Sequence, residues 1–179
     1  MKVAISVAHH PAARGAVFDN INEHDISIII SDLLCSYFEY VVPNIEVVFV
    51  PVGNLKDKIK FINNNNFNIA IETHLNAHIS RSVFGHEVLY CPNSIKGERL
   101  AKKVNQFLSI ANYTKNRGVK EGWYKMEVGG VIDYFLEKTN CPAIIIEPEF
   151  ISNFNKEDIW CIVEAIGKGI RSYERSLCK

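Results

Sequence analysis

The sequence predicts a single α/β domain, residues 1–179, with a mostly parallel central sheet and helices on both of its faces. Short runs of β-branched residues alternate along the chain with longer segments whose apolar residues recur at helical spacing, and this alternation is typical of an α/β sheet. The length of 179 residues, 47% of them hydrophobic, suits one compact core. No repeat or domain linker interrupts the pattern, and the NNNN run at 63–66 indicates a turn.

The first half of the chain predicts three strands and two helices. The β-branched run KVAISV at 2–7 is the first strand. Residues 22–41 predict a helix, because Asn22 can cap it, Asp25 lies in its first turn and apolar residues follow at helical spacing. The elements that follow are a strand at 45–50, a shorter helix at 54–65 and a strand in FNIAIET at 67–73.

The second half continues the alternation less regularly. HEVLYC at 86–91 alternates weakly and predicts a strand that Pro92 and Asn93 end. A helix with an apolar stripe is predicted at 94–111. The remaining predictions are a loop holding NRGVKEG at 116–122, strands near 132–137 and at 142–147, and a last helix from about Asn155.

Charge and hydropathy argue against two kinds of partner. Lys plus Arg equals Asp plus Glu at 20 each, giving a formal net charge of zero, whereas nucleic-acid binding usually requires a basic excess or stripe. No apolar run reaches the roughly 18–20 residues that span a bilayer, and the N-terminal MKVAISVAHH turns polar too early for a signal peptide. We therefore expect a chain without a membrane segment that is synthesised in the cytoplasm.

The cysteines predict neither a disulfide framework nor a zinc ribbon. They are odd in number, scattered and without a CxxC pair. Cys35 and Cys161 lie in apolar helical patterns, so we expect both in the core. If a metal is bound, its ligands are expected to be other residues.

Polar side chains follow three of the predicted strands. Residues 8–10 (Ala-His-His) follow the first strand, residues 72–74 (Glu-Thr-His) end the third, and residues 147–149 (Glu-Pro-Glu) end the strand at 142–147. The first helix opens with Asn22-Glu23-His24-Asp25, which is expected on the same rim of the sheet. Sites in open α/β sheets lie beyond the carboxyl ends of the strands, so these groups are expected to converge. Two imidazoles and one carboxylate are a common ligand set for catalytic zinc, and a further carboxylate can serve as general base. The pattern favours a metal hydrolase.

Each of these residues also has an ordinary interpretation. A hydrogen-bonded surface residue is the default for His10, His24, His78 and His86. Glu23 alone could be a first-turn carboxylate favoured by the helix dipole, and Glu147 or Glu149 could be rim residues. The HxxxH spacing of His74 and His78 is not a helical zinc motif, because Leu75 stands where such motifs place a glutamate and a strand precedes it.

Six short motifs occur in an order typical of one enzyme family. They are ISVAHHPAARGA, NEHDI, IETHLNAH, GHEVLY, NRGVK and IIIEPEFISN, and they span about residues 2–170. In these motifs the chain resembles the zinc-dependent N-acetylmuramoyl-L-alanine amidases of the Amidase_3 type, which include bacterial cell-wall amidases and phage endolysin catalytic domains. The resemblance implies a peptidoglycan hydrolase that cleaves the amide bond between N-acetylmuramic acid and L-alanine.

The resemblance also implies the residues of the site. One Zn²⁺ would be held by His9 after the first strand, by Glu23 at the start of the first helix and by His74 in an HxNA motif that includes Asn76. Glu147 would be the catalytic glutamate, since it stands three residues before the phenylalanine of the E..F.SN motif. It would take the proton of a zinc-activated water and return it to the leaving amine.

Departures from the family pattern leave two assignments open. The glycines around the first histidine are replaced, giving AHHP, so His10 stays a rival to His9. Glu149 stands where glycine is frequent, and it either tunes Glu147 or points away.

Substrate contacts are expected at three further residues. Asn76 belongs to the HxNA motif, and Arg117 and Lys120 are expected from charge and position to bind substrate carboxylates. Ordinary solvated basic residues are the alternative for the last two.

Two other functions compete with the amidase. A zinc carboxypeptidase or other peptidase acting on wall peptides would use the same ligands, and a non-catalytic wall-binding domain would keep the fold alone. Action on the cell wall after release fits a phage endolysin that passes a holin pore and equally a bacterial amidase freed by cell lysis. No wall-binding module is recognisable, so the chain could be a catalytic domain of a longer protein.

Overall fold

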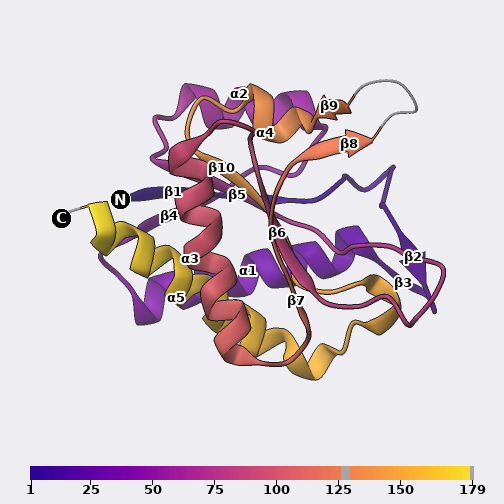
Figure 1. Ribbon diagram of the computed structural model, residues 1–179. Helices are drawn as coiled ribbons and strands as arrows, with labels where there is room; N and C mark the ends of the chain where they lie inside the picture. Colours follow the sequence, from indigo (N-terminus) through magenta and orange to yellow (C-terminus); the bar gives the residue numbers. More distant parts are fainter. Residues whose placement is uncertain (126–129, 178–179) are drawn as a thin grey trace.

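A six-stranded sheet forms the centre of the computed structural model, which describes residues 1–125 and 130–177 (Figure 1). The strand order is β4-β1-β5-β10-β6-β7. The strands are β1 (Lys2–Val7), β4 (Glu46–Phe49), β5 (Ile69–Thr73), β6 (His86–Tyr90), β7 (Asn116–Glu121) and β10 (Ala143–Glu147). Strands β4, β1, β5 and β10 are parallel, whereas β6 is antiparallel to β10 and parallel to β7. The mostly parallel α/β sheet predicted from the sequence is confirmed.

Helices cover both faces of the sheet, also as predicted (Figure 1). Helices α1 (Glu23–Val41), α3 (Ile95–Ala111) and α5 (Ile159–Leu177) pack on one face, and α2 (Leu55–Asn64) and α4 (Tyr134–Lys138) pack on the other. Strand residues alternate between these two layers: Ile71 contacts the α1, α3 and α5 layer, and Ala70 contacts the α2 and α4 layer. Burial on both faces explains why the central strands are apolar throughout.

Smaller elements connect the main ones. They are β2 (Val17–Phe18), β3 (Ile21–Asn22), β8 (Trp123–Lys125), β9 (Gly130–Ile132) and the 3₁₀ turns η1 (Ile151–Asn153) and η2 (Lys156–Asp158). The β2–β3 hairpin leads directly into α1, and the side chain of Asn22 caps that helix by accepting from Asp25 N at 3.0 Å. None of the described helices combines the length and hydrophobicity that crossing a lipid bilayer requires.

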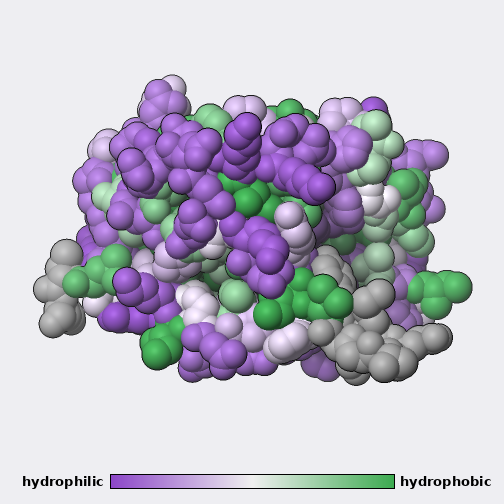
Figure 2. All heavy atoms as spheres, turned by 90° about the horizontal axis from the view of Figure 1, so that it is seen from above, coloured by the Kyte–Doolittle hydropathy of each residue, from purple (hydrophilic) through white to green (hydrophobic). Residues whose placement is uncertain are grey.

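The layer formed by α2 and α4 presents a largely hydrophilic outer surface (Figure 2). On α2 the exposed side chains include Lys56, Asp57 and Lys60, while Ile59 and Ile62 face the core. This is the pattern of an amphipathic surface helix. Lys58 departs from it, because its side chain is buried.

Several local predictions were wrong. Residues 116–121 form the edge strand β7 rather than a loop, and 134–138 form helix α4 where a strand was expected, with Asp133 capping it by accepting from Leu136 N at 3.1 Å. The last helix begins at Ile159, after a 3₁₀ turn, rather than near Asn155. Cys161 is exposed and not in the core, whereas Cys35 is partly buried against it.

Candidate metal centre

The parallel pairing of β1, β5 and β10 brings the carboxyl ends of these strands together at one edge of the sheet. Glu23, the first residue of α1, reaches this edge because the β2–β3 hairpin returns the chain to it. The Glu23 side chain is buried, and backbone amides fix both its oxygens: Ala16 N donates to Oε2 at 3.0 Å and Leu75 N donates to Oε1 at 3.1 Å. The carboxylate is therefore oriented by the fold.

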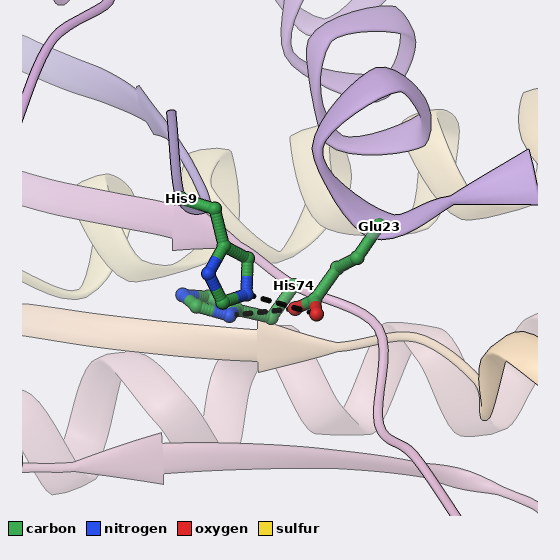
Figure 3. Close-up of side chains that lie close together, drawn as sticks. All are labelled: His9, Glu23 and His74. Carbon is green, nitrogen blue, oxygen red and sulfur yellow. Dashed lines mark hydrogen bonds and ion pairs between the residues drawn. The ribbon is translucent and has the colours of Figure 1, made fainter. Parts of the chain in front are cut away.

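Two histidines face this carboxylate from the ends of β1 and β5 (Figure 3). His9 Nε2 lies 2.9 Å from Glu23 Oε2, and His74 Nδ1 lies 2.9 Å from Glu23 Oε1. The imidazole rings are edge to face with their centroids 5.3 Å apart. One ligand atom from each of the three residues lies within 4.8 Å of the others, so the structure brings together the three residues expected to hold a metal.

Charge in the cluster is strongly coupled. Burial alone would raise the pKa of Glu23, but the hydrogen bonds of His74 and His9 outweigh it and hold that pKa far below its usual range. For His74, burial alone would lower the pKa, but hydrogen bonds to Glu23 and Glu72 raise it well above the ordinary value. Without a metal, protonated imidazole thus supplies the positive charge that the buried carboxylates need.

The backbone at Gly15 passes directly against the side chains of His9 and Glu23. Gly15 has φ +74°, and a Cβ at this position would fall 2.4 Å from His9 Nε2 and 2.5 Å from Glu23 Oε2. Glycine is required here both by the backbone conformation and by the close approach. Two imidazole nitrogens and a carboxylate oxygen are donors that suit Zn²⁺ and leave a position open. The residues therefore fit the metal that the resemblance implies.

Glu147, at the carboxyl end of β10, lies near the cluster with an unsatisfied atom. Its Oε2 is buried and has no hydrogen-bond partner among the described residues. Burial raises its pKa to about 8; the His74 charge opposes this shift, and the carboxylates of Glu23, Glu87 and Asp133 add to it. A carboxyl group with a pKa near neutrality is suited to general acid–base chemistry.

The structure also shows where His10 and Glu149, the residues of the two open assignments, lie. His10 is not part of the cluster, and its Nδ1 accepts a hydrogen bond from Ala12 N at 3.3 Å. Glu149 points away toward the loops, since its Oε1 accepts from Gly85 N at 2.7 Å and Phe150 N at 2.8 Å, and Thr114 donates to its Oε2.

The expectation of surface histidines was wrong for two of the four. His24 is buried and donates from Nδ1 to Ala8 O at 2.7 Å, bracing the turn after β1, and His86 is completely buried. His78 is exposed, beyond the site, and accepts a hydrogen bond from Ser80 N.

The three residues expected to contact substrate converge on Glu87, which sequence reasoning missed. Glu87 Oε2 accepts from Arg117 Nε at 2.7 Å and from Lys120 Nζ at 2.5 Å, and Glu87 Oε1 accepts from Asn76 Nδ2 at 2.9 Å. Glu87 is the register partner of Glu147 in the β6–β10 ladder. Arg117 and Lys120 are thus held beside the site, and the Glu87 carboxylate neutralises part of their positive charge.

A family model described as N-acetylmuramoyl-L-alanine amidase matches residues 3–164. The chain belongs to this amidase family. It is accordingly an N-acetylmuramoyl-L-alanine amidase, a hydrolase of peptidoglycan. No curated protein matches it significantly.

Solved structures of amidases share the fold over nearly their whole length. An N-acetylmuramoyl-L-alanine amidase from Clostridium difficile 630 is 24% identical, with a TM-score of 0.85 over 98% of this chain and 97% of that one. The CwlV catalytic domain from Bacillus (Paenibacillus) polymyxa is 21% identical, with a TM-score of 0.84 over 98% and 99%. The catalytic domain of the CD27L endolysin, which targets Clostridium difficile, is 26% identical, with a TM-score of 0.74 over 96% and 97%.

Proposed function

We propose that residues 1–179 form the catalytic domain of a zinc-dependent amidase that acts on the cell wall, with one Zn²⁺ held by His9, Glu23 and His74. The observation that carries the proposal is the buried His–Glu–His cluster, whose ligand atoms lie within 4.8 Å of one another. Glu147 is its general base. A second carboxylate whose buried oxygen lacks a partner is what this assignment requires.

The residues of the site divide the chemistry among them. Zinc bound at this cluster supplies a Lewis acid for the scissile carbonyl and lowers the pKa of a water molecule. Glu147 Oε2 accepts the proton of the attacking water and delivers it to the leaving nitrogen of L-alanine. The amides of Ala16 and Leu75 keep Glu23 oriented throughout.

Asn76, Arg117 and Lys120 would bind the substrate beside Glu147. Support comes from their shared contact with Glu87, which sets them next to the end of β10. Arg117 and Lys120 place two positive charges on one carboxylate, so the group retains an excess positive charge for a carboxylate of the wall peptide.

Product analysis tests the proposed reaction. Digestion of purified peptidoglycan by the zinc-loaded protein is expected to liberate new amino termini of L-alanine, detected by amine labelling and mass spectrometry. New reducing sugar ends would instead indicate a glycosidase. Cleavage between amino acids of the peptide would indicate the competing peptidase, and no product at all would favour a non-catalytic wall-binding domain.

Zinc binding is expected to release protons and to strengthen as pH rises. The raised pKa of His74 means that the metal-free protein carries a proton on each ring nitrogen, bonded to Glu23 and Glu72. The ligating nitrogen must lose its proton. Below the pKa of His74, each unit of pH should therefore strengthen binding by up to about tenfold. Calorimetric titrations in buffers of different ionisation enthalpy measure this release, and a pH-independent affinity would contradict it.

A further inference from the structure

Lys58 is a buried cation that joins the two segments carrying the histidines. It is the one lysine of α2 whose side chain turns inward, with 2% of its surface exposed. Its Nζ donates to Val7 O at 2.6 Å and to His9 O at 3.4 Å, at the end of β1. The same Nζ donates to Glu72 Oε1 at 2.7 Å, on β5.

Glu72 continues this connection to the ring of His74. Its carboxylate is buried, and Oε1 accepts from Ser6 Oγ at 2.8 Å as well as from Lys58. Its other oxygen, Oε2, lies 3.0 Å from His74 Nε2. The opposite ring nitrogen of His74, Nδ1, faces Glu23. One imidazole is thus held between two carboxylates with different surroundings.

Glu72 and Glu23 give the two ring nitrogens of His74 different roles, one as a hydrogen-bond donor and the other as a metal ligand. Glu72 is anchored by Lys58 and Ser6 and can only accept from His74, so Nε2 must carry a proton. Neutral imidazole then presents a lone pair on Nδ1, directed at Glu23 and the metal cluster. A carboxylate behind a ligating histidine fixes its tautomer and ring orientation and raises its basicity.

Stability alone is a weak explanation for this arrangement. Removing Lys58 and Glu72 from water carries a large desolvation cost, and a buried ion pair is often no better for folding than well-packed apolar residues. The backbone it holds is also unusual, since His9 has a positive φ of 59° without being glycine. The contacts of Lys58 with Val7 O and His9 O bridge this turn to the strand that carries His74.

We propose that Lys58 and Glu72 are positioning residues that select Nδ1 of His74 as the metal ligand and hold the His9 turn against it. This inference rests on the proposed zinc site and deepens it. Neither residue is assigned to metal contact or to substrate. Both line, with His9 and His74, a cavity of about 220 Å³, so removing either charge would admit water behind the ligand rather than collapse the core.

Side-chain ¹⁵N NMR of the zinc-loaded wild-type protein tests the selection directly, without a variant. The expected spectrum has His74 bound to zinc through Nδ1, with a protonated Nε2 protected from exchange. Zinc bound through Nε2 overturns the proposal. Absence of zinc from the wild-type protein overturns the proposed function as well, which distinguishes the two failures.

Zinc affinity of variants, measured by chelator competition, tests the positioning role. Glu72→Gln keeps the shape of the side chain but cannot accept from Lys58, Ser6 and His74 together, so we expect zinc to bind about 10–100-fold more weakly, as for other supporting carboxylates. Lys58→Met should give a loss of similar size, and the double variant should lose little more than either. Lys58→Arg should restore most of the affinity.

Ile62→Ala is the matched control. It loosens the same helix from the same core cluster without touching the polar network, so it should lower Tm and leave the zinc Kd unchanged. Equal zinc affinity in Glu72→Gln and the wild type, or an equal loss in Ile62→Ala, would reduce Lys58 and Glu72 to a structural role.

Discussion

Replacing Glu147 with glutamine is expected to leave zinc bound and to lower kcat by about 10²–10⁴-fold, the range that a positioned general base contributes. Glutamine preserves the size of the side chain but cannot take a proton from water. Its amide also fits the pocket electrostatically, because the wild-type carboxyl has a pKa raised to about 8 by burial. Release of L-alanine amino termini from purified cell walls measures the rate, and metal analysis of the same sample measures the zinc content.

Glu149→Gln is the control for this experiment, since it makes the same chemical change two residues away. Glutamine keeps the oxygen that accepts from the backbone amides of Gly85 and Phe150 but loses the charged oxygen to which Thr114 donates, so the change should cost about 1–3 kcal/mol of unfolding free energy. Its kcat should stay close to that of the wild type. A zinc-loaded Glu147→Gln protein that lyses walls at the wild-type rate would show that the base is another group.

The fold could be predicted largely because its strands and helices are long enough to show their periodicity. The wrong predictions concern elements that are short or that pair with only one neighbouring strand. Strand β7 pairs only with β6, with an irregular register, and an edge strand carries polar residues and tolerates Gly118 at φ +92°. Helix α4 has five residues, too few for a helical period to appear. Its start at Asp133, a favourable cap, was the available signal.

The candidate site was predictable to the extent that its residues follow strand ends. That rule, together with the resemblance, led to His9, Glu23, His74 and Glu147, which the structure places around one edge of the sheet. The supporting residues follow no such rule. Lys58 lies in the polar sequence of an exposed helix, and only the three-dimensional packing reveals that this lysine turns inward.

Gly15→Ala is expected to weaken zinc binding by at least about 100-fold, because backbone strain of about 1–3 kcal/mol is joined by a direct collision. The new Cβ would lie 2.4 Å from the His9 ring and 2.5 Å from Glu23 Oε2, which is closer than real Cβ contacts. The ligands would have to separate, since the amides of Ala16 and Leu75 hold the carboxylate where it is. Activity at limiting zinc should fall with occupancy.

Gly118→Ala separates the two contributions to this effect. Gly118 also has a positive φ, +92°, but a Cβ there would meet nothing within 4 Å, so the variant carries backbone strain of about 1–2 kcal/mol without a collision. Its Tm should fall while its zinc Kd, measured by chelator competition, stays at the wild-type value. If Gly15→Ala binds zinc as tightly as Gly118→Ala does, the metal does not lie between His9 and Glu23. A selective loss in Gly15→Ala would locate the ion against the turn that Gly15 forms, where a methyl group and a metal cannot both be accommodated.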